Sequence, residues 1–367
     1  MVSYADLGVR RVINAMGTVT TLGGSLMPQE VLDAMYEAAR MFVSIPELQE
    51  KAGERIARLT GAEAAYVCAG AACGLMLGTA ACMTRGIRER MNRLPDTQGM
   101  PHECIMLAAH RNGFDFAIRQ TGARIVEVGT VENGATAMDV ISAIGQNTAL
   151  IAFFMAFEQR GKLSLDEVLS VGRSYNVPVL VDAAAELPPA ENLTKFISMG
   201  ADLVVFSGGK GLRGPQSSGF ICGRKDLIAA CAAQGSPNAG IGRVAKVGKE
   251  EIMGLLAALE RFVQLDHEAE RRQWEAQVNT ILDTCKGIVG VRAMRLFPNE
   301  RGQPIPQAVL RLEPHAAVKA AELARYLAEG DPSIRVRQVR DTILINPHML
   351  EPSDEYVICE RLRSILG

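Results

Sequence analysis

Short apolar runs alternate with longer amphipathic stretches along the first two thirds of the chain. An apolar run of about four to eight residues bounded by Gly, Pro or Asp is typical of a buried strand, whereas apolar residues spaced three and four apart indicate a helix. The runs that predict strands are 64–67, 104–107, 124–127, 149–154, 178–181, 203–206 and 219–222. Because such strands alternate with helical patterns, we expect an α/β domain with a mostly parallel seven-stranded sheet covered on both faces.

The remainder of the chain has a different pattern. Residues 28–40 and 47–59 predict two helices before the first strand, and residues 249–285 predict one long helix that leaves the large domain. After it, the predicted strands are 291–296, 308–312, 334–339 and 342–346, and the predicted helices are 317–327 and 355–366. We therefore expect an N-terminal arm (1–27), a large domain (28–248), and a long connecting helix with a small C-terminal α+β domain (249–367).

Composition and charge narrow the classes of partner. The chain has 367 residues, of which 48% are hydrophobic, and its 39 Lys and Arg nearly balance its 41 Asp and Glu. This balance predicts no broad attraction to nucleic acid or to an anionic membrane, so we expect a small-molecule ligand. The uncharged stretch 64–83 is rich in Ala and Gly and divides at Gly70 into a strand and a helix pattern, so it predicts no membrane span.

The cysteines and the N-terminus predict a cytoplasmic protein. Eight cysteines are scattered through the chain without metal-ligand spacing or a dense disulfide framework, so we expect reduced, buried thiols and no metal. The sequence MVSYADLGVRRVINAMG lacks the basic start and apolar run of a signal peptide.

One candidate for anion binding follows the first predicted strand of the sheet. In the segment Cys68-Ala-Gly-Ala-Ala-Cys73, small residues precede a predicted helix. The backbone of Gly70, Ala71 and Ala72 can approach a phosphate there and donate free N–H groups to it. Strings of Gly and Ala also serve tight helix packing, so this motif alone leaves both interpretations open.

Two further candidates are an acid and a lysine that follow buried strands. Asp182 ends the run VLVD, where it either caps the next helix, pairs with an Arg, or contacts the ring nitrogen of a cofactor. Lys210 lies in SGGKGLRGPQSSG, and a lysine surrounded by glycine is not explained as a solvated charge on a helix. A lysine whose pKa is lowered by desolvation can form a Schiff base; the alternative is a phosphate-binding lysine, although the Walker spacing is absent. Ser207 can donate its hydroxyl to the same phosphate.

The remaining candidates are a histidine and several cationic side chains. His110 follows the run CIMLAA, where it either stacks on a cofactor ring or makes structural hydrogen bonds. Arginine suits bidentate contacts with carboxylate or phosphate, although Arg335 and Arg337 equally fit one exposed face of an alternating strand. The candidates for binding substrate anions are Arg213, Arg335, Arg337, Arg340 and His348.

At these residues the chain resembles a known family. The order of a small-residue turn, His110, Asp182 and Lys210 resembles the aspartate-aminotransferase fold, which is fold type I of the pyridoxal 5'-phosphate (PLP) enzymes. Three segments resemble the selenocysteine-synthase-like branch of that fold: INAMGTVTTLGGSLMP, RQTGARIVEVGTVEN and SGGKGLRGPQSSG. The segment ELQEKAGERIARLTGAEAAYVCAGAACGL is most similar to the ammonia-lyases of this branch that act on D-glucosaminate 6-phosphate.

The resemblance implies a cofactor and roles for individual residues. It implies that Lys210 carries PLP as an internal aldimine, that Asp182 pairs with the pyridine nitrogen and that His110 covers the ring. The other cofactor contacts that it implies are Gly70, Ala71, Ala72 and Ser207 at the phosphate, Gln159 at the ring hydroxyl or substrate, and Gln216 with arm residues 18–25 across a homodimer interface.

The resemblance also implies a reaction. Lys210 would remove the α-proton of a 2-amino-3-hydroxy acid, such as an amino sugar acid, and loss of water would lead to a 2-keto-3-deoxy acid and ammonia. An aldolase, a racemase or a β-replacement enzyme would use the same Lys210 and Asp182. A tRNA-dependent selenium transferase is disfavoured, because we recognise no N-terminal RNA-binding domain and no basic surplus.

Overall fold

The chain forms two compact units in the computed structural model, which describes residues 2–367. The larger unit comprises residues 27–264, and the smaller one joins the N-terminal residues up to Leu26 to residues 265–367. No helix within residues 2–367 is both long and apolar enough to cross a membrane.

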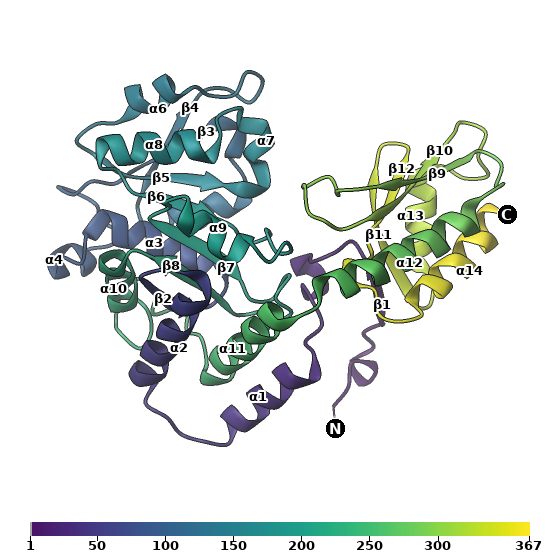
Figure 1. Cartoon of the computed structure of the whole chain (residues 1–367), viewed down its shortest axis with the longest axis horizontal. Coiled ribbons are helices and arrows are strands. Elements are labelled where there is room, and N and C mark those ends of the chain that lie inside the picture. Colours follow the sequence, from purple (N-terminus) through teal and green to yellow (C-terminus); the bar gives the residue numbers. More distant parts are fainter. Residues whose placement is uncertain (1) are drawn as a thin grey trace. The chain divides into compact units, whose positions relative to one another are not determined.

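The large unit is built on the expected seven-stranded sheet, with the order β2-β8-β7-β6-β5-β3-β4 (Figure 1). Its strands are β2 (Ala64–Cys68), β3 (Glu103–Leu107), β4 (Arg124–Val128), β5 (Thr148–Phe154), β6 (Val179–Asp182), β7 (Leu203–Ser207) and β8 (Gly219–Gly223). Only β8 runs antiparallel to its neighbours, so the prediction of a mostly parallel sheet is confirmed.

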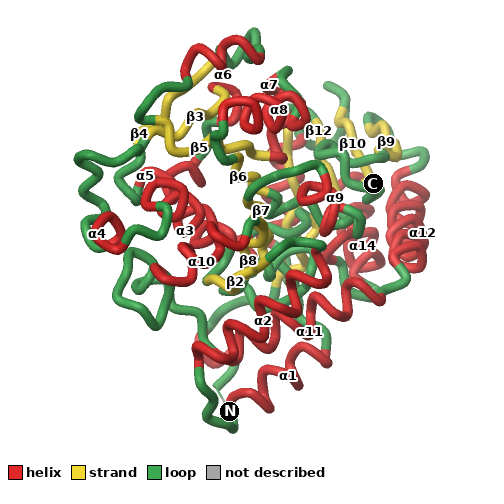
Figure 2. Tube along the Cα trace, turned by 60° about the vertical axis from the view of Figure 1, so that its left-hand side comes forward, coloured by secondary structure: helices red, strands yellow, loops and turns green. Residues whose placement is uncertain are grey.

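Helices cover both faces of this sheet (Figure 2). One face is covered by α2 (Ile45–Thr60), α6 (Ala137–Ala143), α8 (Leu165–Tyr175), α9 (Asn192–Ser198) and α11 (Lys249–Gln264). The other face is covered by α3 (Ala71–Thr84), α5 (Phe116–Arg119) and α10 (Lys225–Gln234), while α1 (Gln29–Ala39) packs on α11. The short helices α4 (Arg88–Met91) and α7 (Glu158–Gly161) belong to connections.

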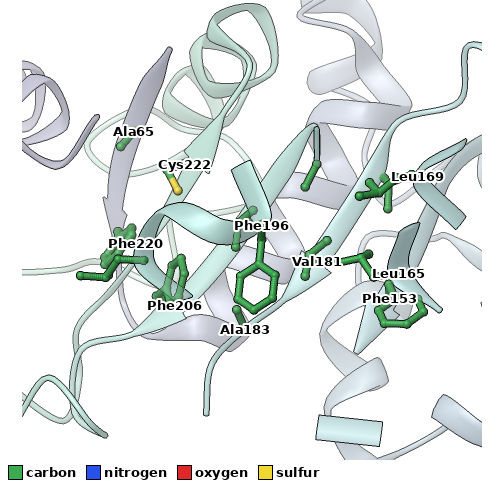
Figure 3. Close-up of a cluster of buried hydrophobic side chains, with 14 of the residues drawn as sticks. Ala65, Phe153, Leu165, Leu169, Val181, Ala183, Phe196, Phe206, Phe220 and Cys222 are labelled. Carbon is green, nitrogen blue, oxygen red and sulfur yellow. The ribbon is translucent and has the colours of Figure 1, made fainter. Parts of the chain in front are cut away.

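Burial on both faces explains why the strands are apolar at nearly every position. Phe153, Val181 and Phe206 project to one face, where Figure 3 shows them beside Leu165 and Phe196. Their neighbours along the same strands, such as Phe154, Leu180 and Val205, pack into the cluster on the opposite face. Successive side chains of a strand point to opposite faces of the sheet. When both faces are buried, every position is apolar and the apolar–polar alternation of a half-exposed strand is absent.

The small unit contains a five-stranded sheet with the order β1-β11-β12-β10-β9. Its strands are β1 (Val12–Ala15), β9 (Val291–Leu296), β10 (Gln307–Leu312), β11 (Ser333–Val339) and β12 (Thr342–Ile345), and its helices are α12 (His267–Cys285), α13 (Ala320–Glu329) and α14 (Asp354–Leu366). The expected four strands and two helices of a C-terminal α+β unit are therefore present, together with a fifth strand from the N-terminus.

The N-terminal arm differs from the expectation of a separate segment. Strand β1 pairs in parallel with β11, and its residues Ile13 and Ala15 are buried in the core of the small unit. A strand of four residues has too short a pattern to be recognised, because its stability depends on a partner more than 300 residues away along the chain.

The single helix expected over 249–285 is two helices. Helix α11 ends at Gln264, and Asp266 begins α12 as its N-cap, with a side chain that accepts the Ala269 N–H at 2.9 Å. The aspartate cap separates the two helices, but the apolar residues on either side of it keep helical spacing. The sequence pattern therefore predicted one continuous helix. The division between the units therefore lies at 264/265, whereas the sequence suggested 248/249.

Candidate active site

The predicted site residues of the large unit follow strands that lie next to each other. Strands β3, β5, β6 and β7 are adjacent and parallel, so their carboxyl ends meet at one edge of the sheet. In the sheet register, Asp182 lies between Phe154 of β5 and Val205 of β7. The segments that contain His110, Gln159 and Lys210 begin directly beyond this edge.

Asp182 and Lys210 are close enough for their charges to interact. The Asp182 carboxylate is half-buried at the end of β6, and its Oδ1 accepts the Ala184 N–H at 2.9 Å. Burial raises the pKa of Asp182 above its usual range, while that N–H and the positive charge of Lys210 act in the opposite direction. The structure therefore brings together the acid and the lysine that the sequence analysis had selected separately.

The glycines around Lys210 are required by close backbone contacts. A Cβ on Gly209 would lie 2.5 Å from the Cα of Gln216, and one on Gly211 would lie 2.2 Å from the carbonyl oxygen of Leu187. The loop folds back on itself through the Gly208 N–H, which donates to the Ser218 carbonyl at 2.8 Å. This packing explains the glycine-rich motif and gives the backbone of Lys210 a defined position.

The turn between β2 and α3 forms an open cradle for an anion. Gly70 is the N-cap of α3 with a φ of 84°, and a Cβ built on it would meet no atom within 4 Å. The first N–H groups of a helix have no partner within the helix, and the helix dipole favours negative charge near them. Ala71 and Ala72 are at least partly exposed beside this space, so the structure leaves room for a phosphate there.

Gly219 connects this turn to β7, a role that the sequence analysis did not assign. A Cβ on Gly219 would lie 2.7 Å from the carbonyl oxygen of Phe206 and 2.9 Å from the carbonyl carbon of Gly70. Ser207 pairs with Gly219 in the β7–β8 register and is half-buried. Gly219 therefore allows the turn to approach β7 closely, on the side where the hydroxyl-bearing Ser207 ends that strand. The one available signal was a glycine at the first position of an otherwise apolar strand.

Two cysteines flank the same turn. Cys68 ends β2 and Cys73 lies in the first turn of α3, and both are buried free thiols. Their hydrogen bond lowers the pKa of Cys73, whereas the pKa of Cys68 is raised by that bond and by burial. The expectation of reduced, buried thiols agrees with the structure, in which all eight cysteines are buried and free. Residues 2–367 contain no cluster of three or more His, Cys, Asp or Glu side chains suited to a metal ion.

His110 differs from the role that the resemblance implied. The residue is 0% exposed, and its ring packs edge-on against Phe153 at a centroid distance of 4.7 Å. A side chain that covers a cofactor needs one ring face directed into the binding space, and a completely buried imidazole offers none. The burial of His110 therefore favours the structural alternative over stacking.

The other predicted residues of the large unit are more exposed. Gln159 lies on α7 and Gln216 lies in the loop after Lys210, and both side chains are exposed. Arg213 is half-buried, with a backbone in the left-handed region at a φ of 58°. Their positions near the edge of the sheet are compatible with ligand contacts, and Asp182 is the acid whose charge interacts with that of Lys210.

The remaining candidates belong to the small unit. Arg335 and Arg337 are exposed on β11, and the Arg337 guanidinium pairs with Glu300. Arg340 follows β11 and is also exposed. His348 is 4% exposed and packs beside Trp274, at a centroid distance of 5.2 Å.

Comparison with known proteins identifies the family. The model of the family described as "SelA: L-seryl-tRNA selenium transferase" matches residues 113–317. A D-glucosaminate-6-phosphate ammonia lyase of Salmonella typhimurium is 36% identical to this chain over 99% of its length and 97% of the relative. The chain belongs to the SelA family. A 5'-C-glycyluridine monooxygenase-decarboxylase of Streptomyces is also 36% identical, over 99% of this chain and 92% of the relative.

Solved structures identify the fold of this SelA-family protein. The structure of a D-glucosaminate-6-phosphate ammonia-lyase matches 99% of the chain with a TM-score of 0.87 and 36% identity. A serine palmitoyltransferase with PLP bound as an internal aldimine matches with a TM-score of 0.60 and 14% identity, a likeness that concerns the fold alone. The prediction of fold type I is therefore confirmed.

Proposed function

We propose that this protein is a PLP-dependent ammonia-lyase that acts on D-glucosaminate 6-phosphate or a closely related amino sugar acid. The observation that carries the proposal is the electrostatic coupling of Asp182 with Lys210 at the carboxyl edge of a fold type I sheet. The similarity to the Salmonella lyase, at 36% identity over nearly the full length of both chains, supports this choice within the SelA family.

The residues at the sheet edge fit PLP. The open space beside Gly70 and the free N–H groups of Ala71 and Ala72 suit the phosphate, and the Ser207 hydroxyl can donate to it. Asp182 would hold the proton on the pyridine nitrogen, and the Lys210 amine would bind the aldehyde carbon. When bound, PLP supplies an electron sink that stabilises the negative charge left on the substrate Cα.

The chain itself supplies proton transfer and orientation. The Lys210 Nζ would take the proton from the substrate Cα, since a lysine amine at this position can act as a general base when it is neutral. Loss of the 3-hydroxyl group as water then leaves a product that hydrolyses to a 2-keto-3-deoxy acid and ammonia. The Ala184 N–H fixes the position of the half-buried Asp182 carboxylate. The carboxylate would therefore stay directed at the protonated pyridine nitrogen.

Arginines are the proposed contacts for the anionic groups of the substrate. Arg213 is close to Lys210 along the chain, and Arg335 is exposed on β11. Arg337 is a weaker candidate, because its guanidinium already pairs with Glu300. A substrate with a carboxylate and a phosphate requires more than one such cation, and arginine binds either group in bidentate geometry.

We further propose a cytoplasmic homodimer with shared active sites. The exposed Gln216 and arm residues 18–25 would contact the cofactor of the partner subunit. The apolar side chains on and after α1 support this proposal, because Tyr36, Met41 and Phe42 are 61%, 57% and 105% exposed in the single chain and a partner subunit could cover them. Large exposed apolar groups of this kind often mark protein interfaces.

The decisive experiment measures products from 2-amino sugar acids with and without a 6-phosphate. We expect equal amounts of ammonia and 2-keto-3-deoxy acid from D-glucosaminate 6-phosphate, with a visible absorption band in the purified protein. Lys210→Ala should lose both turnover and that band, whereas Lys225→Ala, at an exposed lysine that begins α10, should retain both.

Other outcomes would redirect the proposal. Oxygen consumption with release of carbon dioxide and no keto acid would favour chemistry of the kind named for the Streptomyces relative. Turnover and absorption that persist in Lys210→Ala would refute the assignment of the lysine.

A further inference from the structure

The imidazole of His110 connects the ends of two strands at the candidate site. His110 is the last residue of the 3-10 helix η3 (Ala108–His110), which directly follows β3. Its Nδ1 accepts the N–H of Phe154, the last residue of β5, at 3.3 Å. The imidazole packs edge-on against Phe153 with an angle of 77° between the ring planes. His110 therefore fixes the point at which the chain leaves β5.

The chemical state of this imidazole follows from its surroundings. Because the Phe154 N–H donates to Nδ1, the neutral ring carries its hydrogen on Nε2. Burial lowers the pKa of His110 to about 4, so the ring is neutral near pH 7. The backbone of Phe157 acts in the opposite direction on this pKa, but the effect of burial is larger. The specific contribution of a histidine at this position is therefore its buried Nδ1 acceptor, which satisfies the Phe154 N–H.

The other side of the imidazole faces helix α7. A Cβ on Gly161, the last residue of α7, would lie 2.9 Å from His110 Nε2 and 2.5 Å from Leu107 Cδ2. The Gly161 carbonyl also accepts the Ala135 N–H at 3.0 Å. Helix α7 is therefore held at its end between His110 and residue 135, and this short helix carries the exposed Gln159.

We propose that His110 is a positioning residue: it fixes the segment 154–161 so that Gln159 faces the bound cofactor or substrate. It acts through the Phe154 N–H and through contact with Gly161, and it does not touch the cofactor ring. This inference rests on the proposed function for the identity of the ligand, but the tethering of the segment is independent of it.

Two substitutions separate positioning from stacking. His110→Asn can place an amide oxygen where Nδ1 accepts the Phe154 N–H, whereas His110→Phe keeps a flat ring and loses the acceptor. We expect kcat for the amino sugar acid to stay within about threefold in His110→Asn and to fall about tenfold in His110→Phe, which is the range of one lost hydrogen bond. Binding of PLP should change less than about threefold in both variants, since the ring is not contacted. The reverse order, with an active Phe variant and weak PLP binding in the Asn variant, would establish stacking and overturn the proposal.

A second measurement does not depend on activity. Hydrogen exchange followed by mass spectrometry on peptides covering 154–161 should show exchange about tenfold faster in His110→Phe and nearly unchanged in His110→Asn. Unchanged exchange in His110→Phe would refute the tether. If the wild-type protein forms no ammonia from any amino sugar acid, the proposed function fails, and the exchange experiment still decides the role of His110.

Gly161→Ala tests the same tether with the histidine intact. The added methyl group would displace α7 from His110, so we expect faster exchange over 154–161 and a fall in kcat of about tenfold, even if His110→Phe does not fold. Gly145→Ala is the matched control, because a Cβ on Gly145 meets no atom within 4 Å. Equal behaviour of the two alanine variants would contradict the proposal.

Discussion

Gly219→Ala should weaken cofactor binding by moving the turn that is proposed to hold the phosphate. The added Cβ would lie 2.7 Å from the Phe206 carbonyl oxygen of β7, 2.9 Å from the Gly70 carbonyl carbon and 3.0 Å from the Ala71 nitrogen, whereas ordinary contacts begin at 3.4 Å. The turn must therefore move by about 0.5 Å, the difference between 2.9 and 3.4 Å, and the end of β7 must also shift. Overpacking of this kind costs about 1–3 kcal/mol.

The expected loss of affinity follows from the hydrogen bonds of the turn. A hydrogen bond to a charged group contributes about 1.5–3 kcal/mol, so partial loss of one such bond by displacement of the turn corresponds to about 1–2 kcal/mol. That loss weakens PLP binding about 5- to 30-fold. The melting temperature of the cofactor-free protein should fall by several degrees because of the added strain.

Equilibrium dialysis of the cofactor-free protein against PLP and against pyridoxal tests this reasoning. Gly219→Ala should weaken PLP binding and leave the weaker binding of pyridoxal nearly unchanged, because pyridoxal lacks the phosphate. Gly145→Ala, whose Cβ lies in open space, should bind both as the wild type does. Equal loss for both ligands, or no loss in a folded Gly219→Ala protein, would refute the link between Gly219 and the phosphate turn.

Two further predictions concern charge and thiol chemistry. Burial raises the pKa of Asp182 above the value of 3.8 that it has in the unfolded chain. At a pH between these two pKa values the folded protein holds a proton on Asp182 that the unfolded chain has lost. The free energy of unfolding therefore falls as pH rises through this range. Asp182→Asn should therefore raise the melting temperature of the cofactor-free protein at pH 7, with a smaller gain near pH 4; an equal gain at both would contradict this. The pKa of Cys73 is lowered, whereas burial raises the pKa of Cys82 and Cys222 to about 12. Because the thiolate is the reactive form, Cys73 should be the first of the eight cysteines that iodoacetamide alkylates. Mass spectrometry after timed exposure identifies the order of alkylation.

The strands of the large sheet and the two main site residues were predictable because their signals are local. A strand buried on both faces requires an apolar side chain at every position, as in β5 and β7, so its pattern is visible without knowledge of its neighbours. Asp182 and Lys210 follow such strands directly, and neither side chain fits an apolar surrounding without a partner. These two residues could therefore be selected from their local patterns, whereas their proximity was implied only by the resemblance to fold type I enzymes.

Tertiary structure alone decided the features that depend on distant neighbours. Strand β1 exists because β11 is present to pair with it, and the break before α12 depends on a capping hydrogen bond of Asp266 that apolar spacing does not reveal. The sequence pattern located His110 after β3, but its burial depends on Phe153 and Gly161, which belong to other elements. Local patterns determine which segments become strands and helices, whereas the partner and surroundings of each side chain depend on how those elements pack.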